Sequence, residues 1–455
     1  MTSPILWQNT AQTVALLDIP RSISAAQGSI QHPCHGLLLS SKPLDVPFPI
    51  QEPKTAAARA NLEANTVDAA LAGVYHALLD DALGQIRENH EGEWCLPRPF
   101  VEDPKPKVGK KRKLDIDELP NEVEALPHDA HAARRTLPSD VFKELSSVST
   151  AKGWYLGTAP EEPEAVDDHS LTSATHDPHF RPAYREETMR LIARNRHLPV
   201  TYGFRIPPRA SFYLSSVAES RAFHAAIRAQ AQEDSTPRHF NCILLDPPWP
   251  NRSVTRTHQT AGSTYTIAPT LRSVQKLILG MDLEMVMGED CLVGIWITNK
   301  PAIRNLVLGE GGLFDCWGVE LTEEWVWLKT TIHGEPVTRI ASAWRKPYEV
   351  LLLGSRKRNL YEDNPTGMQQ PKRRVLVAVP DLHSRKPCLK ELIEPLLSSL
   401  EGETRVLEVF ARHLVAGWWS WGDECIKFNW EGCWHASALN GPDRVGSSPA
   451  VISTP

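Results

Sequence analysis

Several segments in the second half of the chain are continuously apolar, and this feature most restricts the fold. Strands that are apolar on both faces need a covering layer on each face, as in α/β proteins with parallel sheets. Segments with helical spacing separate these runs, so we predict an open, mostly parallel, doubly wound α/β sheet. We expect strands at 212–217, 240–246, 291–298, 324–329, 349–354, 373–380, 405–411 and 425–428, and helices at 186–196, 271–287, 303–314 and 389–400.

The 455 residues exceed one ordinary domain, and composition suggests where the chain divides. Residues 55–89 are rich in Ala and Leu at helical spacing, whereas the segment around PEEPEAVDDHS cannot bury enough apolar surface to offset ordering entropy. We expect a partly helical accessory region at 1–96, a disordered low-complexity linker at 97–182, an α/β domain at 183–432 and a flexible tail at 433–455.

Charge and cysteine content exclude several classes of protein. The net charge of −6 rules out a histone-like basic coat, so any nucleic-acid surface must be local. The eight cysteines form no C-x-x-C pair, which argues against zinc or any other metal site and against a disulfide framework. No apolar run reaches the length of a membrane span. We expect a soluble intracellular protein without a membrane partner.

The linker contains a basic cluster, PKPKVGKKRKLD, at 104–115. A lysine- and arginine-rich segment on flexible chain is the form that import receptors bind. The alternative is a solvated run of charge. We predict nuclear localisation, with the receptor contacting Lys110, Lys111, Arg112 and Lys113.

The tetrapeptide Asp246-Pro247-Pro248-Trp249 directly follows the apolar run CILL, where ligands bind in doubly wound sheets. Two prolines form a rigid turn, because neither has an N–H for the ladder. The Asp246 carboxylate and the Pro247 carbonyl provide two acceptors for an exocyclic NH₂ group, and Trp249 offers a face for stacking on a base. The alternative is an ordinary turn after a buried strand. We favour activation of an adenine amino group for attack on a sulfonium methyl donor.

The segment from Asp246 to Val254 resembles the DPPW adenine-N6 methyltransferases, and among them the branch called methyltransferase-like protein 4. Further stretches agree in order: IPPRASFYLSS, WITNK, EWVWLK, KPYEVLLLG, LHSRKP and LEVFARHLVAGWWSWGDE. The resemblance covers about 199–428. It implies a Rossmann-like S-adenosylmethionine-dependent methyltransferase with permuted motif order, in which the catalytic strand precedes the cofactor strand, and makes 183–432 the catalytic domain.

The resemblance also implies roles for individual residues. Asp246, Pro247, Pro248 and Trp249 are the catalytic motif, and Lys386 contacts the methionine carboxylate of S-adenosylmethionine. The remaining cofactor residues are Ser216, Val217, Phe410, Arg412, His413, Asp423 and Glu424, together with Asp246. Three positions depart from the family pattern, which usually has Asn at 423, Asn at 413 and commonly an acidic residue at 216. Each replacement can still form a hydrogen bond.

The nucleic acid would be held by a basic region and a loop after the motif. Residues 345–390 contain eleven Lys and Arg and four Asp and Glu, which is an excess of seven positive charges. The alternative is that these cations only solvate a surface. A base methylated here must be unstacked. The expected substrate-binding residues are Asn251, Arg252, Arg256, Tyr265, Lys329 and Glu349.

Our leading hypothesis is an adenine-N6 methyltransferase of the nucleus. The branch implies RNA, particularly small nuclear RNA with 2′-O-methylated adenosine, and a functional monomer. DNA adenine is the second candidate substrate. From other classes, we keep open a non-catalytic nucleic-acid-binding scaffold of the same fold and a methyltransferase for a free amide or small amine.

Overall fold

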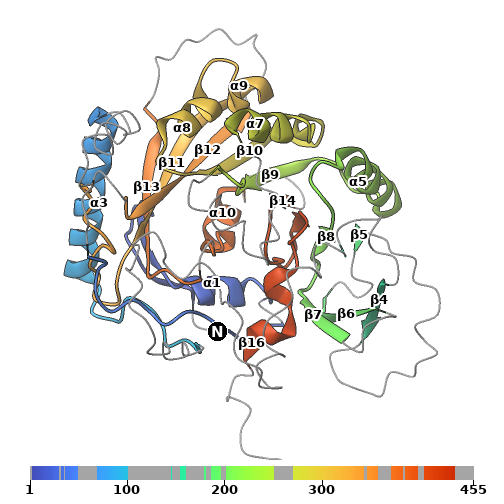
Figure 1. Cartoon of the computed structure of the whole chain (residues 1–455), viewed down its shortest axis with the longest axis horizontal. Helices are drawn as coiled ribbons and strands as arrows, with labels where there is room; N and C mark the ends of the chain where they lie inside the picture. Colours follow the sequence, from blue (N-terminus) through green and yellow to red (C-terminus); the bar gives the residue numbers. More distant parts are fainter. Residues whose placement is uncertain are drawn as a thin grey trace, which may run out of the picture.

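The computed structural model describes residues 3–29, 32–34, 36–49, 69–100, 145, 154–159, 179–180, 186–195, 201–250, 270–342, 346–356, 370–382, 385–397 and 404–435. These residues are built around one large sheet (Figure 1). The order of its strands is β1 (Ile5–Gln8), β2 (Val14–Leu17), β13 (Lys372–Ala378), β11 (Val319–Lys329), β12 (Tyr348–Arg356), β10 (Met287–Ile297), β9 (Phe240–Leu245), β14 (Val406–Val409), β15 (Trp419–Trp421), β8 (Ser211–Tyr213) and β5 (His179–Phe180).

Most neighbours in this sheet are parallel, as predicted. The run β10-β9-β14-β15-β8 is parallel throughout, and so is β2-β13-β11. Strand β12 is antiparallel to β11 and β10 and joins the two parallel runs. The catalytic strand β9 precedes its neighbour β14 in the chain, which agrees with the permuted order.

Helices cover both faces of the sheet, which explains the continuously apolar strands. Within β9, Ile243 and Leu245 belong to one buried cluster, and Cys242 and Leu244 to the other. This alternation across the sheet is what a strand with two covered faces produces. The first cluster contains side chains of α3 (Ala69–Asn89), α5 (Ser220–Asp234), α7 (Leu271–Leu279), α8 (Pro301–Leu308) and α9 (Leu313–Trp317); the second contains those of α1 (Ile19–Ala25) and α10 (Lys390–Leu397).

The amino-terminal region is part of the main sheet, which sequence reasoning did not anticipate. Strand β2 pairs in parallel with β13, from Val14 opposite Val375 to Leu17 opposite Ala378. All four residues of β2 are buried. The accessory region at 1–96 therefore contributes strands as well as helices, and α3 begins at Ala69 within the predicted helical segment.

A second, smaller sheet corrects the prediction of a helix at 186–196. Met189–Asn195 is strand β6, which lies between β4 (Trp154–Ala159) and β7 (Thr201–Ile206). Met189, Leu191 and Ala193 are buried at every second position, which is the period of a strand. A two-stranded pair is formed by β16 (Trp434–His435) and β3 (Leu37–Leu38).

Other predicted boundaries also change. The helix expected at 271–287 ends at Leu279, and a 3₁₀ turn, η1 (Leu283–Met285), follows before β10 begins. The helix expected at 303–314 is divided into α8 and α9. The strand expected at 425–428 is wrong, because this part of the chain forms the 3₁₀ turns η2 (Lys427–Asn429) and η3 (Glu431–Cys433). Among the described helices, none combines the length and the hydropathy needed to span a bilayer.

Candidate active site at the carboxyl edge of the sheet

Four charged side chains of alternating sign meet at the edge where the parallel strands end. Asp246 directly follows β9, Lys386 follows β13, Glu349 lies near the start of β12, and Lys329 is the last residue of β11. Lys386 Nζ lies 2.9 Å from Asp246 Oδ1 and 3.0 Å from Oδ2. The same nitrogen is 3.1 Å from Glu349 Oε2, and Lys329 Nζ donates to Glu349 Oε1. We call this set the Asp246 chain.

Two members of the Asp246 chain, Glu349 and Lys386, have pKa values shifted towards their charged forms. Burial by itself would raise the pKa of Glu349, but the ammonium groups of Lys329 and Lys386 hold it well below its usual range. Burial likewise opposes the charge on Lys386, and the carboxylates of Asp246 and Glu349 outweigh it and raise its pKa. Lys386 therefore presents a cation to the Asp246 carboxylate.

The turn after β9 is fixed by hydrogen bonds on both sides. The N–H of Trp249 donates to the carbonyl of Pro247 at 2.8 Å, and Lys300 Nζ donates to the carbonyl of Pro250 at 2.7 Å. A carbonyl oxygen has two lone pairs, so that of Pro247 can accept one more hydrogen bond. The two expected acceptors thus remain available on one rigid turn, and Pro248, half-buried, lies between them and Trp249.

Trp249 is placed differently from the stacking role expected for it. Its side chain belongs to a buried cluster, the residue is only 9% exposed, and its indole N–H donates to the carbonyl of Trp296 at 2.7 Å. An indole with so little exposed surface offers no free face to a base. Trp249 therefore forms a wall that fixes the turn against β10.

The expected cofactor residues lie on neighbouring loops of the same edge, because β14, β15 and β8 are adjacent and parallel. Phe410 follows β14 with φ of +62°, a left-handed conformation rare for a residue other than Gly, and its N–H donates to Trp421 at 2.8 Å. Val217, after β8, is buried, whereas Ser216 beside it is exposed. The left-handed turn at Phe410 brings the segment after β14 across the end of β15.

Asp423 and His413, which lie near the ends of β15 and β14, both have strongly shifted pKa values. Burial, followed by the neighbouring charge of Glu424, raises the pKa of Asp423 to about 6. Burial, followed by the charge of Arg385, lowers the pKa of His413 to about 4, so its imidazole is neutral at physiological pH. His413 Nε2 has no hydrogen-bond partner among the residues that the structure describes. A buried polar atom of this kind suits a ligand with hydrogen-bonding groups.

Glu424 and Arg412 are already engaged with each other. Arg412 Nε lies 3.4 Å from Glu424 Oε2, and Lys427 Nζ lies 2.9 Å from Glu424 Oε1. The Glu424 side chain is 3% exposed. The Glu424 carboxylate therefore forms ion pairs with Arg412 and Lys427. A ligand that contacts this carboxylate directly would have to share it with these two cations.

Sequence reasoning missed Glu408, an acidic residue close to Asp246. Glu408 lies on β14 opposite Leu244, two residues before Asp246 on β9. Burial and the charge of Asp246 raise its pKa to about 8. The signal was present in the sequence, because Glu408 is an acidic residue inside the apolar run VLEVF.

Several predicted positions fall outside the described residues. These are the substrate-side residues Asn251, Arg252, Arg256 and Tyr265 and the basic cluster Lys110, Lys111, Arg112 and Lys113. Of the predicted substrate-binding set, Lys329 and Glu349 are described, and both belong to the Asp246 chain.

Comparison with known proteins agrees with this geometry. The family model MT-A70 matches residues 240–424, from the first residue of β9 to Glu424. The N6-methyladenosine RNA methyltransferase MTA1 of Pyricularia oryzae is 30% identical over 97% of this chain and 99% of its own length. The N(6)-adenine-specific methyltransferase METTL4 of Mus musculus is 32% identical over 49% of this chain and 43% of its own length. The DNA N6-methyl methyltransferase of Caenorhabditis elegans is 29% identical over 49% of this chain and 53% of its own length.

The match to the Pyricularia oryzae protein extends over both chains almost end to end, and the family match covers β9, the turn after it and the segments after β14 and β15 as far as Glu424. The α/β sheet is that of S-adenosylmethionine-dependent methyltransferases, and the relatives support adenine N6 in nucleic acid as the group that is methylated. The chain belongs to the MT-A70 family of N6-adenine methyltransferases.

Proposed function

We propose that this chain transfers a methyl group from S-adenosylmethionine to N6 of adenosine in RNA. The observation that carries the choice of RNA is the relative from Pyricularia oryzae, which matches nearly the whole chain and is named an RNA methyltransferase. The relative named for DNA matches about half of the chain. DNA adenine is therefore the second candidate.

The Asp246 chain supports a mechanism in which the protein aligns a weak nucleophile. The amino group of adenine donates one N–H to the Asp246 carboxylate and the other to the free lone pair of the Pro247 carbonyl. Two acceptors that hold both hydrogens free the nitrogen lone pair for attack, and this stabilisation is strongest in the transition state. Lys386 holds the Asp246 carboxylate in place through contacts to both of its oxygens, and the proton released after transfer passes to water or to Asp246.

The described residues fit the methyl donor, which would supply an electrophilic methyl on a sulfonium centre. Lys386 Nζ already contacts both oxygens of Asp246 and Oε2 of Glu349, so its positive charge would attract the donor's carboxylate, which would share these N–H groups. Asp423 can accept from the ribose hydroxyls when it is ionised, and the unpartnered Nε2 of His413 can complete a further hydrogen bond. These three residues would orient the donor opposite the amino group.

A direct test uses labelled S-adenosylmethionine with matched RNA and DNA oligonucleotides of one sequence. Transfer to RNA at least about tenfold faster than to DNA is expected, since the two differ at the 2′ position of each sugar. A third oligonucleotide with 2′-O-methyladenosine at the target tests the small nuclear RNA context. Faster transfer to DNA would refute the choice of RNA.

The variant Asp246→Ala tests the catalytic assignment. It removes the charged acceptor from the turn and should abolish transfer while the far-ultraviolet circular dichroism stays native. Retained transfer would refute the mechanism. Calorimetric titration of the unaltered protein with S-adenosylmethionine separates an enzyme from a scaffold of the same fold, because a scaffold that does not bind the donor gives no heat.

We also propose that the protein acts in the nucleus as a monomer. The basic segment from Lys110 to Lys113 supports import by its composition. Replacing its four basic residues with Ala should move a fluorescent fusion to the cytoplasm, and an unchanged nuclear signal would refute the assignment. Mass photometry of the active protein measures the oligomeric state.

A further inference from the structure

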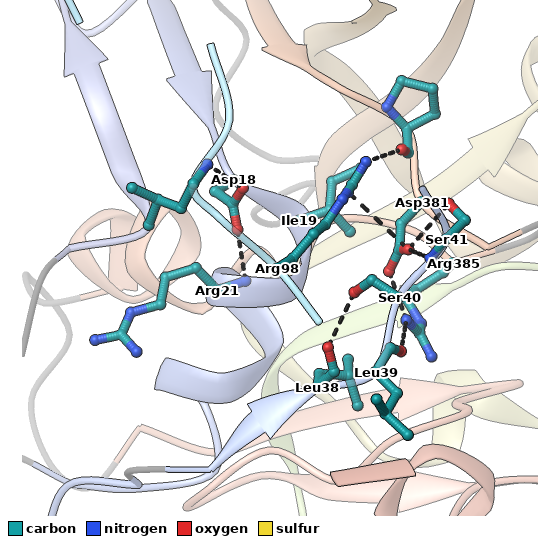
Figure 2. Close-up of polar contacts among 12 residues, drawn as sticks. Asp18, Ile19, Arg21, Leu38, Leu39, Ser40, Ser41, Arg98, Asp381 and Arg385 are labelled. Carbon is teal, nitrogen blue, oxygen red and sulfur yellow. Dashed lines mark hydrogen bonds and ion pairs between the residues drawn. The ribbon is translucent and has the colours of Figure 1, made fainter. Parts of the chain in front are cut away.

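A buried cluster of charged side chains lies beneath the segment that carries Lys386. Its members are Asp18, Arg98, Asp381 and Arg385, and we call it the Asp381 cluster (Figure 2). The side chains of Asp381, Arg385 and Arg98 are 0%, 1% and 2% exposed. Burying charged side chains costs desolvation free energy. Such a cluster is stable only when its ion pairs and hydrogen bonds are well aligned.

Asp381 is the centre of the cluster. Its Oδ1 accepts from the backbone N–H of Ser41 at 2.8 Å and lies 4.0 Å from Arg98 Nη1, and its Oδ2 lies 2.5 Å from Arg385 Nη1. Arg385 Nη1 also donates to the carbonyl of Leu39 at 3.0 Å. This ion pair joins two residues four apart in the chain, and we call the described residues on its two sides, 380–382 and 385–388, the loop. Lys386 directly follows Arg385.

Three separate parts of the first hundred residues hold this loop. The segment with Leu39 and Ser41 binds it from one side. Arg98 Nη2 donates to the carbonyl of Pro380 at 2.9 Å, and the hydroxyl of Ser22, in α1, accepts from the N–H of Cys388 at 2.9 Å. Contacts to the amino-terminal region therefore occur at the start, in the middle and at the end of the loop.

The amino-terminal pieces are also joined to each other. Asp18 caps α1 by accepting from the N–H of Arg21 at 2.9 Å, and its other oxygen accepts from the N–H of Leu96 at 2.9 Å, both drawn in Figure 2. The start of α1 is thereby fixed to the segment that ends in Arg98. The amino-terminal residues that hold the loop are thus joined to each other by hydrogen bonds, and we call them the frame.

We propose that Arg98 and Asp381 are positioning residues for the reaction: they seat the loop that places the ammonium of Lys386 between Asp246 and Glu349. Arg385 is buried on the frame side while its neighbour Lys386 reaches the Asp246 chain, so a shift of Arg385 moves Lys386 directly. Displacements near 1 Å are enough to impair catalysis. The described residues of the amino-terminal region thus act on the active site although none of them belongs to the Asp246 chain.

The test compares two full-length variants with the same substitution. Arg98→Met removes the contact to Pro380 and the charge near Asp381. Arg374→Met is the matched control: Arg374 is buried, pairs with Glu323 and donates to the amino-terminal carbonyl of Gln12 at 3.1 Å, but it lies near the start of β13, at the opposite end from the loop. Both should lower Tm.

The readout is the rate at which an amine-acetylating reagent modifies Lys386, measured by peptide mass spectrometry and normalised to exposed Lys372. Two carboxylates hold Lys386 in the unaltered protein, so it should react slowly. Arg98→Met should increase its rate about threefold or more, because a loosened loop opens more often, whereas Arg374→Met should leave it within about 1.5-fold. Arg98→Lys, which keeps the charge, should give an intermediate rate and replaces Arg98→Met if that variant does not fold.

Equal rates in Arg98→Met and Arg374→Met would overturn the proposal, whether both rise or neither does. The inference rests on the catalytic site proposed above, but the labelling requires neither donor nor nucleic acid. An unaltered protein without methyl transfer would refute the proposed function and leave this result standing.

Discussion

The pair formed by Lys386 and Asp246 gives the sharpest quantitative test of the active site. Two unit charges about 3 Å apart attract by about 5 kcal/mol at an effective dielectric constant of about 20. The side chains are 17% and 28% exposed, and Lys386 is shared with Glu349, so the net coupling should be smaller, about 1–3 kcal/mol. Lys386→Met alone should cost about 3 kcal/mol, because it leaves two carboxylates facing each other.

The measurement is a double-mutant cycle of Lys386→Met and Asp246→Asn by urea denaturation. The loss of unfolding free energy in the double variant should be smaller than the sum of the two single losses. The difference should equal the coupling of about 1–3 kcal/mol. Lys390→Met is the control, since its pair with Glu394 at 2.7 Å is more exposed and should be worth less than about 1 kcal/mol. Each single change in the Asp246 chain should lower kcat by about 100-fold or more. Additivity within about 0.5 kcal/mol would refute the view that Lys386 stabilises the ionised carboxylate.

Three further predictions concern Glu408, Asp423 and Trp249. The pKa of Glu408, raised to about 8 from 4.5, means that the folded protein holds a proton that the unfolded chain releases, so stability falls as pH rises through this window. Glu408→Gln should therefore raise Tm above about pH 8 and leave it nearly unchanged below about pH 4.5; an equal shift at both would contradict the assignment. The pKa of Asp423, about 6, predicts that KM for S-adenosylmethionine rises as pH falls through this value, and Asp423→Asn should remove the dependence. Trp249→Phe loses the hydrogen bond to Trp296 and should lower the free energy of unfolding by about 1–2 kcal/mol, with little change in KM for nucleic acid; a large rise in that KM would restore the stacking role.

The central strands and the catalytic turn could be predicted because their signals are local. The run FNCILLD became β9, from Phe240 to Leu245, and Asp246 lies where a ligand-binding carboxylate was expected. Lys386 and Glu349 were also identified, through the family resemblance. Their mutual ion pair could not be read from the sequence, because it joins residues from separate strands and loops.

The errors also have physical causes. The helix predicted at 186–196 is wrong, because the buried positions Met189, Leu191 and Ala193 alternate with a period of two. The four residues of β2 are too few to separate a buried strand from a short apolar helix by pattern. The Asp381 cluster could not be found at all, since Arg98 and Asp381 are far apart in the chain and neither stands in a recognisable motif.

The pairing of β2 with β13 has a consequence for how this protein is synthesised. Strand β2 is synthesised long before its partner β13, which begins at Lys372, and stays without that partner until then. Sheets closed by such distant pairings form slowly, and the unpaired edge is open to association meanwhile. A chain shortened from its amino terminus would keep that edge of β13 exposed permanently, and we expect it to aggregate rather than to yield a smaller working enzyme.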